Sequence, residues 1–239
     1  MVDSEILLTS ERKYCIIQYR RERKSAVNKI NYQKELDKTL EQLTAEGRKP
    51  SLLLHACCAP CSSYVIEYLS AYFEITLYFY NPNIAPREEY EKREEELRRL
   101  CREMEEKGML SSPVRLLSGA YEPERFIGLA RGREALPEGG ERCFACYALR
   151  LGETARAAKE GGFDYMTTTL SISPYKNAEK LNELGRELER QTGIPYLYSD
   201  FKKRNGYHRS IALSEEFQLY RQDYCGCIYS RAEREQRKG

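Results

Sequence analysis

The chain has 239 residues, a formal net charge of +2, and 32% charged against 41% hydrophobic residues, a composition typical of a globular protein with an ample core. It has no apolar run as long as a membrane span, and its first residues lack the pattern of a secretory signal. We therefore expect a cytoplasmic protein with no membrane partner. The small net charge gives no global basic field of the kind that indicates nucleic-acid binding.

Residues 1–28 are charged and irregular, so we expect an N-terminal extension followed by one metal-binding catalytic domain over residues 29–239, with a cysteine pair near its end. Apolar periodicity and turn residues predict alternating helices and strands. The predicted helices cover about 32–43, 62–71, 87–107, 123–131, 143–160, 177–191 and 214–220, and the predicted strands cover 51–55, 74–80, 114–117, 164–170 and 196–198. This alternation predicts an α/β fold with a mostly parallel sheet and helices on both faces, which binds ligands at the carboxyl ends of its strands.

Seven of the nine cysteines fall into three short clusters, each near the predicted start or end of an element. The clusters are Cys57, Cys58 and Cys61, then Cys143 and Cys146, then Cys225 and Cys227. They predict one metal site assembled from distant parts of the chain. Because there are only two histidines, sulfur would supply most ligands, which selects zinc or iron-sulfur chemistry. A structural zinc or one 4Fe-4S cluster needs four ligands, so the surplus thiols favour iron, a second metal or a redox dithiol.

The other polar signals are weaker. Cys15 and Cys101 stand alone and are interpreted as incidental. His55 could tune a cluster or move a proton, or it could be a structural histidine at the end of a strand. Basic runs such as Lys202–Arg204 are typical of solvated surfaces.

Five segments together closely resemble the QueH family of epoxyqueuosine reductases, over roughly residues 30–230. They are HACCAPCSSYVIEYL (55–69), YFYNPNIAPREEYEKR (78–93), RCFACYALRLGETARAA (142–158), TTTLSISPYKN (167–177) and YRQDYCGCIYS (220–230). The resemblance implies a Rossmann-like (HUP-like) fold and a tRNA-modifying oxidoreductase that converts epoxyqueuosine to queuosine at the wobble position. It also implies a 4Fe-4S cluster beside a mononuclear iron, which together would use all seven clustered thiols.

Under this resemblance, the cluster ligands are expected to be Cys58, Cys143, Cys146 and Cys227, and the catalytic thiols at the second iron Cys57, Cys61 and Cys225. The sequence itself does not divide the seven. Candidate substrate-binding residues are polar side chains in or near the same segments, with strand capping and core hydrogen bonding as the alternative. They are Asn81, Asn83, Thr168, Thr169, Ser173, Lys176, Arg221 and Tyr224.

The implied reaction is a two-electron reductive deoxygenation, with the second iron as Lewis acid and the cluster passing electrons from an external low-potential donor. The partner would be tRNA carrying epoxyqueuosine, whose base must leave the anticodon stack. Its phosphates could contact Lys202–Arg204. Two other functions stay open: a zinc-stabilised tRNA-binding protein without redox activity, and a thiol-disulfide oxidoreductase using Cys143 and Cys146.

Overall fold

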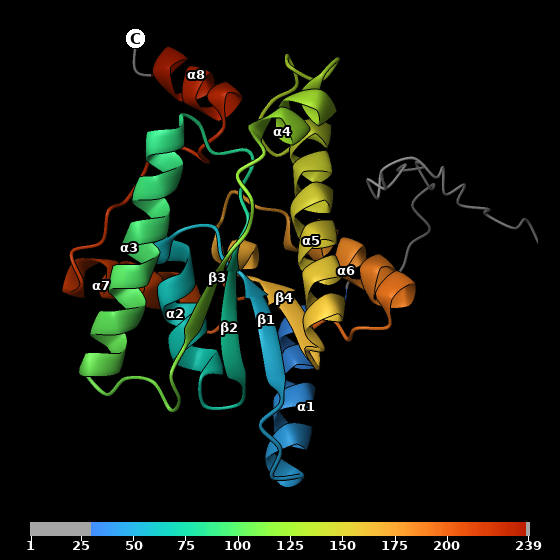
Figure 1. Ribbon diagram of the computed structural model, residues 1–239, viewed down its shortest axis with the longest axis vertical. Helices are drawn as coiled ribbons and strands as arrows, with labels where there is room; N and C mark the ends of the chain where they lie inside the picture. The colour runs from blue at the N-terminus through green and yellow to red at the C-terminus, as the bar shows by residue number, and fades with distance from the viewer. Residues whose placement is uncertain (1–29, 238–239) are drawn as a thin grey trace, which may run out of the picture.

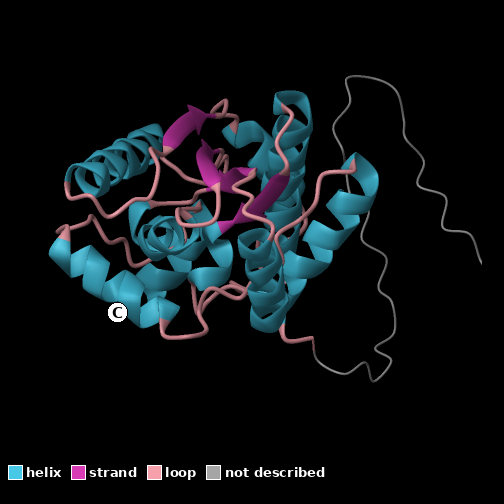
Figure 2. Ribbon diagram, turned by 90° about the horizontal axis from the view of Figure 1, so that it is seen from below, coloured by secondary structure: helices cyan, strands magenta, loops and turns pink. Residues whose placement is uncertain are grey.

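The computed structural model describes residues 30–237. In them, one parallel sheet in the order β3-β2-β1-β4 is covered by helices on both faces (Figure 1 and Figure 2). The strands are β1 Ser51–His55, β2 Glu74–Phe79, β3 Arg115–Ser118 and β4 Tyr165–Thr168. The helices are α1 Tyr32–Ala45, α2 Ala59–Leu69, α3 Arg87–Glu106, α4 Pro123–Ala130, α5 Glu141–Gly161, the 3₁₀ turn η1 Thr169–Ile172, α6 Ala178–Thr192, α7 Gly206–Glu216 and α8 Ile228–Gln236. The predicted α/β fold is confirmed, whereas the N-terminal extension and Cys15 lie outside the described residues.

Strand β1 is central because both of its faces are covered. Leu52 and Leu54 join the core cluster shared with α2 and α3, while Leu53 joins the cluster on the side of α5 and α6. This division follows from the alternation of side chains along a strand, and the three consecutive leucines are typical of a doubly covered parallel strand. In Figure 1, α2, α3 and α7 lie on one side of the sheet and α5 and α6 on the other.

The side of the sheet on which successive strands are added changes at β1. The chain adds β2 and β3 on one side of β1 and then places β4 on the other side. The segments that follow β1 and β4 therefore diverge, and the carboxyl ends of these two strands form the position where such sheets bind ligands. No helix among residues 30–237 combines the length and apolarity that crossing a membrane requires.

Three predicted elements were wrong in part. Residues 196–198 form no strand, because only Tyr196 makes an isolated bridge, to Met166. The strand predicted to reach residue 170 ends at Thr168, whose hydroxyl accepts a hydrogen bond from the Leu170 amide at the start of η1. Helix α7 begins eight residues before the predicted helix 214–220 and ends at Glu216, and α8 falls in a charged C-terminal segment for which the sequence predicted only a solvated helix face or tail.

Candidate metal centre and active site

Three thiols meet directly beyond β1. After the strand ends at His55, the chain passes Cys57 and enters α2 with Cys58 as the N-cap residue. The Sγ atoms of Cys57, Cys58 and Cys61 lie within 4.8 Å of one another, and the first two are 3.8 Å apart. Because a tetrahedral ion with sulfur bonds of about 2.3 Å spaces its ligands about 3.8 Å apart, this group has the spacing of a metal site.

The other two clusters in the sequence come together at a second group of thiols. Cys143 and Cys146 lie in the first two turns of α5, and Cys227 is the N-cap of α8. Burial, together with negative charge on Cys225, Cys227 and Cys143 and against the positive charge of Arg150, raises the pKa of the Cys146 thiol to about 12. The structure therefore brings residues from α5 and from the segment before α8 within electrostatic reach of each other.

All three cysteine clusters lie at helix amino termini. The helices are α2, α5 and α8, and in Figure 1 the start of α5 and the whole of α8 lie beyond the carboxyl edge of the sheet. Unpaired backbone amides at these ends stabilise sulfur anions, as shown by the amides of Gly139 and Ser230, which each donate to a cysteine sulfur at 3.3 Å. Each cysteine cluster therefore lies beside the partial positive charge of a helix amino terminus.

The thiols of the first group shift one another's pKa values in opposite directions. Hydrogen bonds from Cys58 and Cys61, assisted by the nearby Arg150, hold the pKa of Cys57 well below its usual range. The same bonding to Cys57 raises the pKa of Cys58 to about 12 and that of Cys61 well above its usual range. Without a metal, most of these buried thiols are protonated, so metal binding must release protons.

Two buried arginines flank the thiols, and the sequence reasoning had missed both. Arg150 lies on α5 one turn after Cys146, is 1% exposed, and donates to Asn81 Oδ1 and His55 Nε2. Arg93 lies on α3, pairs with Glu89 at 2.7 Å, and donates to the Cys225 carbonyl at 3.1 Å. The signal for Arg150 was its i+4 spacing from Cys146 on the buried side of a helix.

His55 is a neutral, structural histidine. Burial, followed by the positive charge of Arg150, lowers its pKa to about 3. Its Nδ1 lies 2.8 Å from the Thr168 hydroxyl, and its Nε2 lies 3.2 Å from the Tyr80 carbonyl oxygen and 3.3 Å from the Arg150 Nε. The imidazole therefore positions groups around the thiols and does not serve as an acid near neutral pH.

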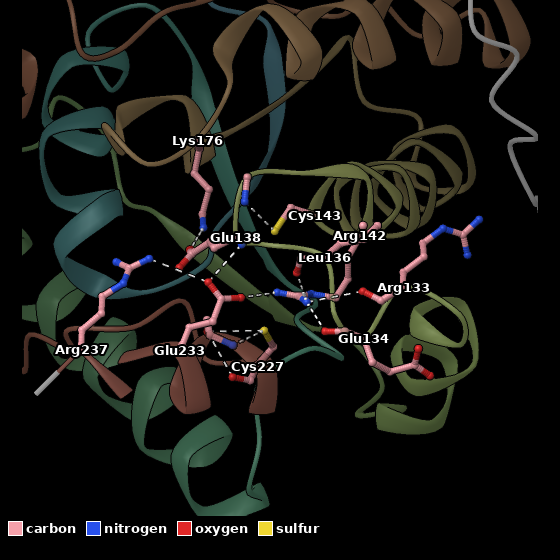
Figure 3. A network of polar contacts seen from close by, with 12 residues as sticks. Arg133, Glu134, Leu136, Glu138, Arg142, Cys143, Lys176, Cys227, Glu233 and Arg237 are labelled. Carbon is pink, nitrogen blue, oxygen red and sulfur yellow. Dashed lines mark hydrogen bonds and ion pairs between the residues drawn. The ribbon is translucent and has the colours of Figure 1, made fainter. Parts of the chain in front are cut away.

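A network of ion pairs joins the elements that carry Cys143 and Cys227 (Figure 3). The buried Arg142 pairs with Glu233 of α8 at 2.8 Å and donates to the carbonyl of Glu134 at 2.7 Å. Glu233 also accepts from the Glu138 amide at 3.1 Å, and the Glu138 side chain pairs with Lys176 at 2.9 Å. The network ties α8 to the start of α5 and to the segment after β4.

Four of the predicted substrate residues face structural partners. Asn81 donates to the Ala56 carbonyl at 2.9 Å and accepts from Arg150, while Thr168 bonds His55. The Ser173 hydroxyl accepts from the Tyr175 amide at 3.3 Å, and the ring of Tyr224 lies 5.2 Å from the Arg93 guanidinium. These contacts match the alternative that the sequence left open, capping and core hydrogen bonding.

The other four predicted substrate residues differ from one another. Thr169 Oγ1 lies 3.7 Å from Cys57 Sγ, and Asn83 is buried with neither of its side-chain amide atoms hydrogen bonded. Lys176 is buried; burial lowers its pKa, but negative charge on Cys225, Tyr147 and Glu138 together with the hydrogen bond to Glu138 raises it overall. Arg221 is exposed. Among these buried residues, Asn83 and Thr169 are therefore the ones whose side chains are best placed to form hydrogen bonds with a ligand.

The donor set fits a sulfur-ligated metal centre. Apart from Asn83, the buried atoms that lack partners in residues 30–237 include Tyr147 Oη, whose pKa is raised by burial and then by nearby charges including those of Cys143 and Cys225. Unmatched buried polar atoms of this kind indicate a polar guest, such as an ion, water or a substrate. The eighth described cysteine, Cys101, belongs to neither thiol group and lies on α3 inside the hydrophobic core.

Comparison with known proteins agrees with this geometry. The family model described as "Epoxyqueuosine reductase QueH" matches residues 52–233. Similar proteins with that name include one from Streptococcus pyogenes, 43% identical over 84% of this chain and 78% of the relative. Others come from Staphylococcus epidermidis, 42% identical over 84% and 85%, and from Thermotoga maritima, 33% identical over 78% and 93%. The chain therefore belongs to the epoxyqueuosine reductase QueH family and is an oxidoreductase.

Proposed function

We propose that this protein reduces epoxyqueuosine to queuosine at the wobble position of tRNA, using a 4Fe-4S cluster and an adjacent iron. The observation that carries the proposal is the close group of Cys57, Cys58 and Cys61 at the ligand-binding edge of a chain that belongs to this family, with four further thiols, those of Cys143, Cys146, Cys225 and Cys227, near enough to one another to shift the pKa of Cys146. The reaction consumes two electrons and two protons, forms a carbon-carbon double bond, and releases the epoxide oxygen as water. An external low-potential donor supplies the electrons.

The burial of the thiols supports one division between the two iron sites. Cys58, Cys143, Cys146 and Cys227 are buried, whereas Cys57, Cys61 and Cys225 are partly exposed. An electron-transfer cluster benefits from insulation, while an iron that meets a nucleoside must be reached from outside. We therefore assign the buried four to the cluster and the other three to the second iron.

A specific observation favours a competing division. The close spacing of the Cys57, Cys58 and Cys61 sulfurs would suit a single ion bound by these three. The cluster would then fall to Cys143, Cys146, Cys225 and Cys227. The two divisions differ only in the exchange of Cys58 and Cys225.

Bound iron would supply Lewis acidity toward the epoxide oxygen and a route for single electrons. The chain itself would hold and orient the substrate. Thr169, beside Cys57, and Asn83, with its unbonded amide, are the groups that we assign to the diol of the substrate. The Lys176 ammonium, kept charged near Cys225, is a hydrogen-bond donor at the same site.

Binding of the tRNA backbone would depend little on two members of the predicted basic run. Lys202 pairs with Asp200 at 2.9 Å, and Arg204 pairs with Asp37. Local carboxylates thus already compensate these charges, whereas Lys203 is exposed and has no ion pair among the described residues. We therefore expect Lys203 to dominate any contribution of this run to phosphate binding.

The experiment that tests the function is anaerobic purification, iron and sulfide analysis, and reaction of tRNA carrying epoxyqueuosine with excess dithionite. Mass spectrometry of the wobble nucleoside should show queuosine. Filled iron sites together with unchanged epoxyqueuosine would refute the assignment. A colourless protein that carries only zinc would support the binding function, and activity retained through a reversible Cys143–Cys146 disulfide after metal removal would support the dithiol function.

Single Cys→Ala variants distinguish the two divisions. Under our assignment, Cys58→Ala loses iron and sulfide to the same extent as Cys227→Ala, and Cys225→Ala retains the sulfide. Under the competing division, Cys225→Ala loses the sulfide and Cys58→Ala retains it. Cys101→Ala is the control, because this thiol lies on α3 in the hydrophobic core and belongs to neither group.

A further inference from the structure

Arg150 is a buried cation with no carboxylate partner among residues 30–237. Twenty-two ion pairs join other charged side chains of this part of the protein, and none of them includes Arg150. A guanidinium removed from water without a countercharge costs several kcal/mol, so such groups persist only where an anion compensates them.

Neutral groups fix the orientation of the Arg150 guanidinium without cancelling its charge. Its Nε donates to His55 and its Nη2 donates to Asn81. His55 is in turn fixed by Thr168, and Asn81 by the Ala56 carbonyl. Because all of these groups are neutral, the positive charge remains available to whatever lies on the other side of the guanidinium.

Sulfur atoms are the anions near this cation. Arg150 lies one helical turn after Cys146 on α5, and its partner His55 ends the strand that leads directly to Cys57. In agreement with this placement, burial lowers the pKa of Arg150, but negative charge on Cys146, Cys57 and Cys225 raises it overall. These three cysteines come from all three sequence clusters and from both spatial groups of thiols. Ligation by four thiolates gives a divalent ion a net charge of −2, so a nearby cation favours the ligated state over protonated thiols and free metal.

We propose that Arg150 is the positioning residue that supplies the fixed countercharge of the sulfur site, stabilising metal ligation by thiolates in both groups. The inference rests on the sulfur-ligated metal centre of the proposed function but not on its substrate. It assigns the chain Asn81–Arg150–His55–Thr168 to holding this charge in place.

Cobalt(II) binding to the reduced, metal-free protein tests the proposal, with thiolate-to-cobalt absorption as the signal. Arg150→Gln removes the charge and should weaken cobalt affinity at least tenfold, while Arg150→Lys keeps the charge and should weaken it less. Arg99→Gln is the control, because Arg99 is partly buried and paired with Glu96 and Glu103, away from the thiols. It should bind cobalt like the unaltered protein.

Asn81→Asp separates the charge from a purely structural role. A carboxylate at residue 81 would pair with Arg150 but could not donate to the Ala56 carbonyl, so Asn81→Leu is the control, because it loses the same hydrogen bond and leaves the guanidinium charge in place. A purely structural role predicts that Asn81→Asp binds cobalt no more weakly than Asn81→Leu. The countercharge role predicts weaker binding than in Asn81→Leu, because the new anion cancels the guanidinium. Asn81→Asp also decides the question if circular dichroism shows that Arg150→Gln does not fold.

The reduction potential after iron loading is a second measurement. In Arg150→Gln the reduced form should be disfavoured at least tenfold, a fall of about 59 mV for a one-electron couple. Folded Arg150→Gln with unaltered cobalt affinity and potential, or Asn81→Asp that binds cobalt no more weakly than Asn81→Leu, would overturn the proposal. Cobalt affinity does not depend on whether the protein reduces epoxyqueuosine, so this result stands apart from the test of the function.

Discussion

Glu233→Ala removes the only carboxylate that pairs with Arg142 in the described residues. Arg142 is 1% exposed and Glu233 25%, and their charged atoms lie 2.8 Å apart. The substitution also leaves the Glu138 amide without its acceptor. Figure 3 shows that Glu233 is the point where α8 joins this network. We therefore expect Glu233→Ala to destabilise the attachment of α8 by more than the loss of an exposed surface ion pair would.

The expected loss of stability follows from the ion pair that Arg142 loses and the hydrogen bonds that it keeps. Breaking a buried ion pair costs about 3–5 kcal/mol, but Arg142 still donates to backbone carbonyls, including that of Glu134 at 2.7 Å. The lower end of that range applies, about 3 kcal/mol. For a domain of this size, Tm should then fall by about 6–12 °C.

The assay is thermal unfolding of the metal-loaded protein, followed by circular dichroism, together with the rate at which a chelator removes metal. Glu235→Ala is the matched control, since Glu235 lies on the same helix, is 57% exposed, and pairs with Arg231 of that helix. It should change stability by at most about 0.5 kcal/mol. Equal Tm values for the two variants would refute the reasoning. Metal loss should accelerate in Glu233→Ala, because α8 carries Cys227 at its first turn.

Three further outcomes are expected. Cys101→Ala should leave iron and sulfide contents unchanged but lower the free energy of unfolding by roughly 1 kcal/mol, since this thiol fills core space, and loss of iron on analysis would contradict this placement. Gly185→Ala should destabilise by about 1–3 kcal/mol in denaturant titration, because an added Cβ would overlap the Tyr196 ring, whereas Gly152→Ala, with open space around its Cβ, should be neutral or stabilising. Lys203→Ala should flatten the salt dependence of tRNA binding by about one counterion, and an unchanged slope would exclude this residue from the phosphate contacts.

The sequence contained enough local signal to predict the parallel sheet and the position of the first group of thiols at its carboxyl edge. Three consecutive leucines before a cysteine segment indicated a buried strand, and the carboxyl edge of such a sheet is a general ligand position. The partners of the polar residues could not be predicted in the same way. Asn81 and Asn83 are the same residue type two positions apart, yet only tertiary packing gives the first two partners and the second none.

Charged residues misled the sequence reasoning in two places. Helix α8 was missed because its arginines and glutamates are typical of a solvated surface, although Glu233 is drawn into contact with a buried arginine. Arg150 was missed because a single arginine within a helix is usually exposed, and the partners that hold it in the interior, His55 and Asn81, come from two other segments. The prediction of a fifth strand at residues 196–198 was wrong because this segment makes a single bridge to β4, at Tyr196, and a strand needs consecutive bridges to its neighbour.

The placement of cysteines at the starts of α2, α5 and α8 has a mechanical consequence. The proposed metal centre, held by these thiols, would fasten the segment after the first strand, a central helix and the last helix to one another, as disulfide bonds would, and would close a loop that contains most of the described chain. Such a cross-link restricts the unfolded ensemble most when the closed loop is long. The last helix then cannot separate from the sheet unless metal-sulfur bonds break, so the chain should lose its metal and its C-terminal structure in a single cooperative step.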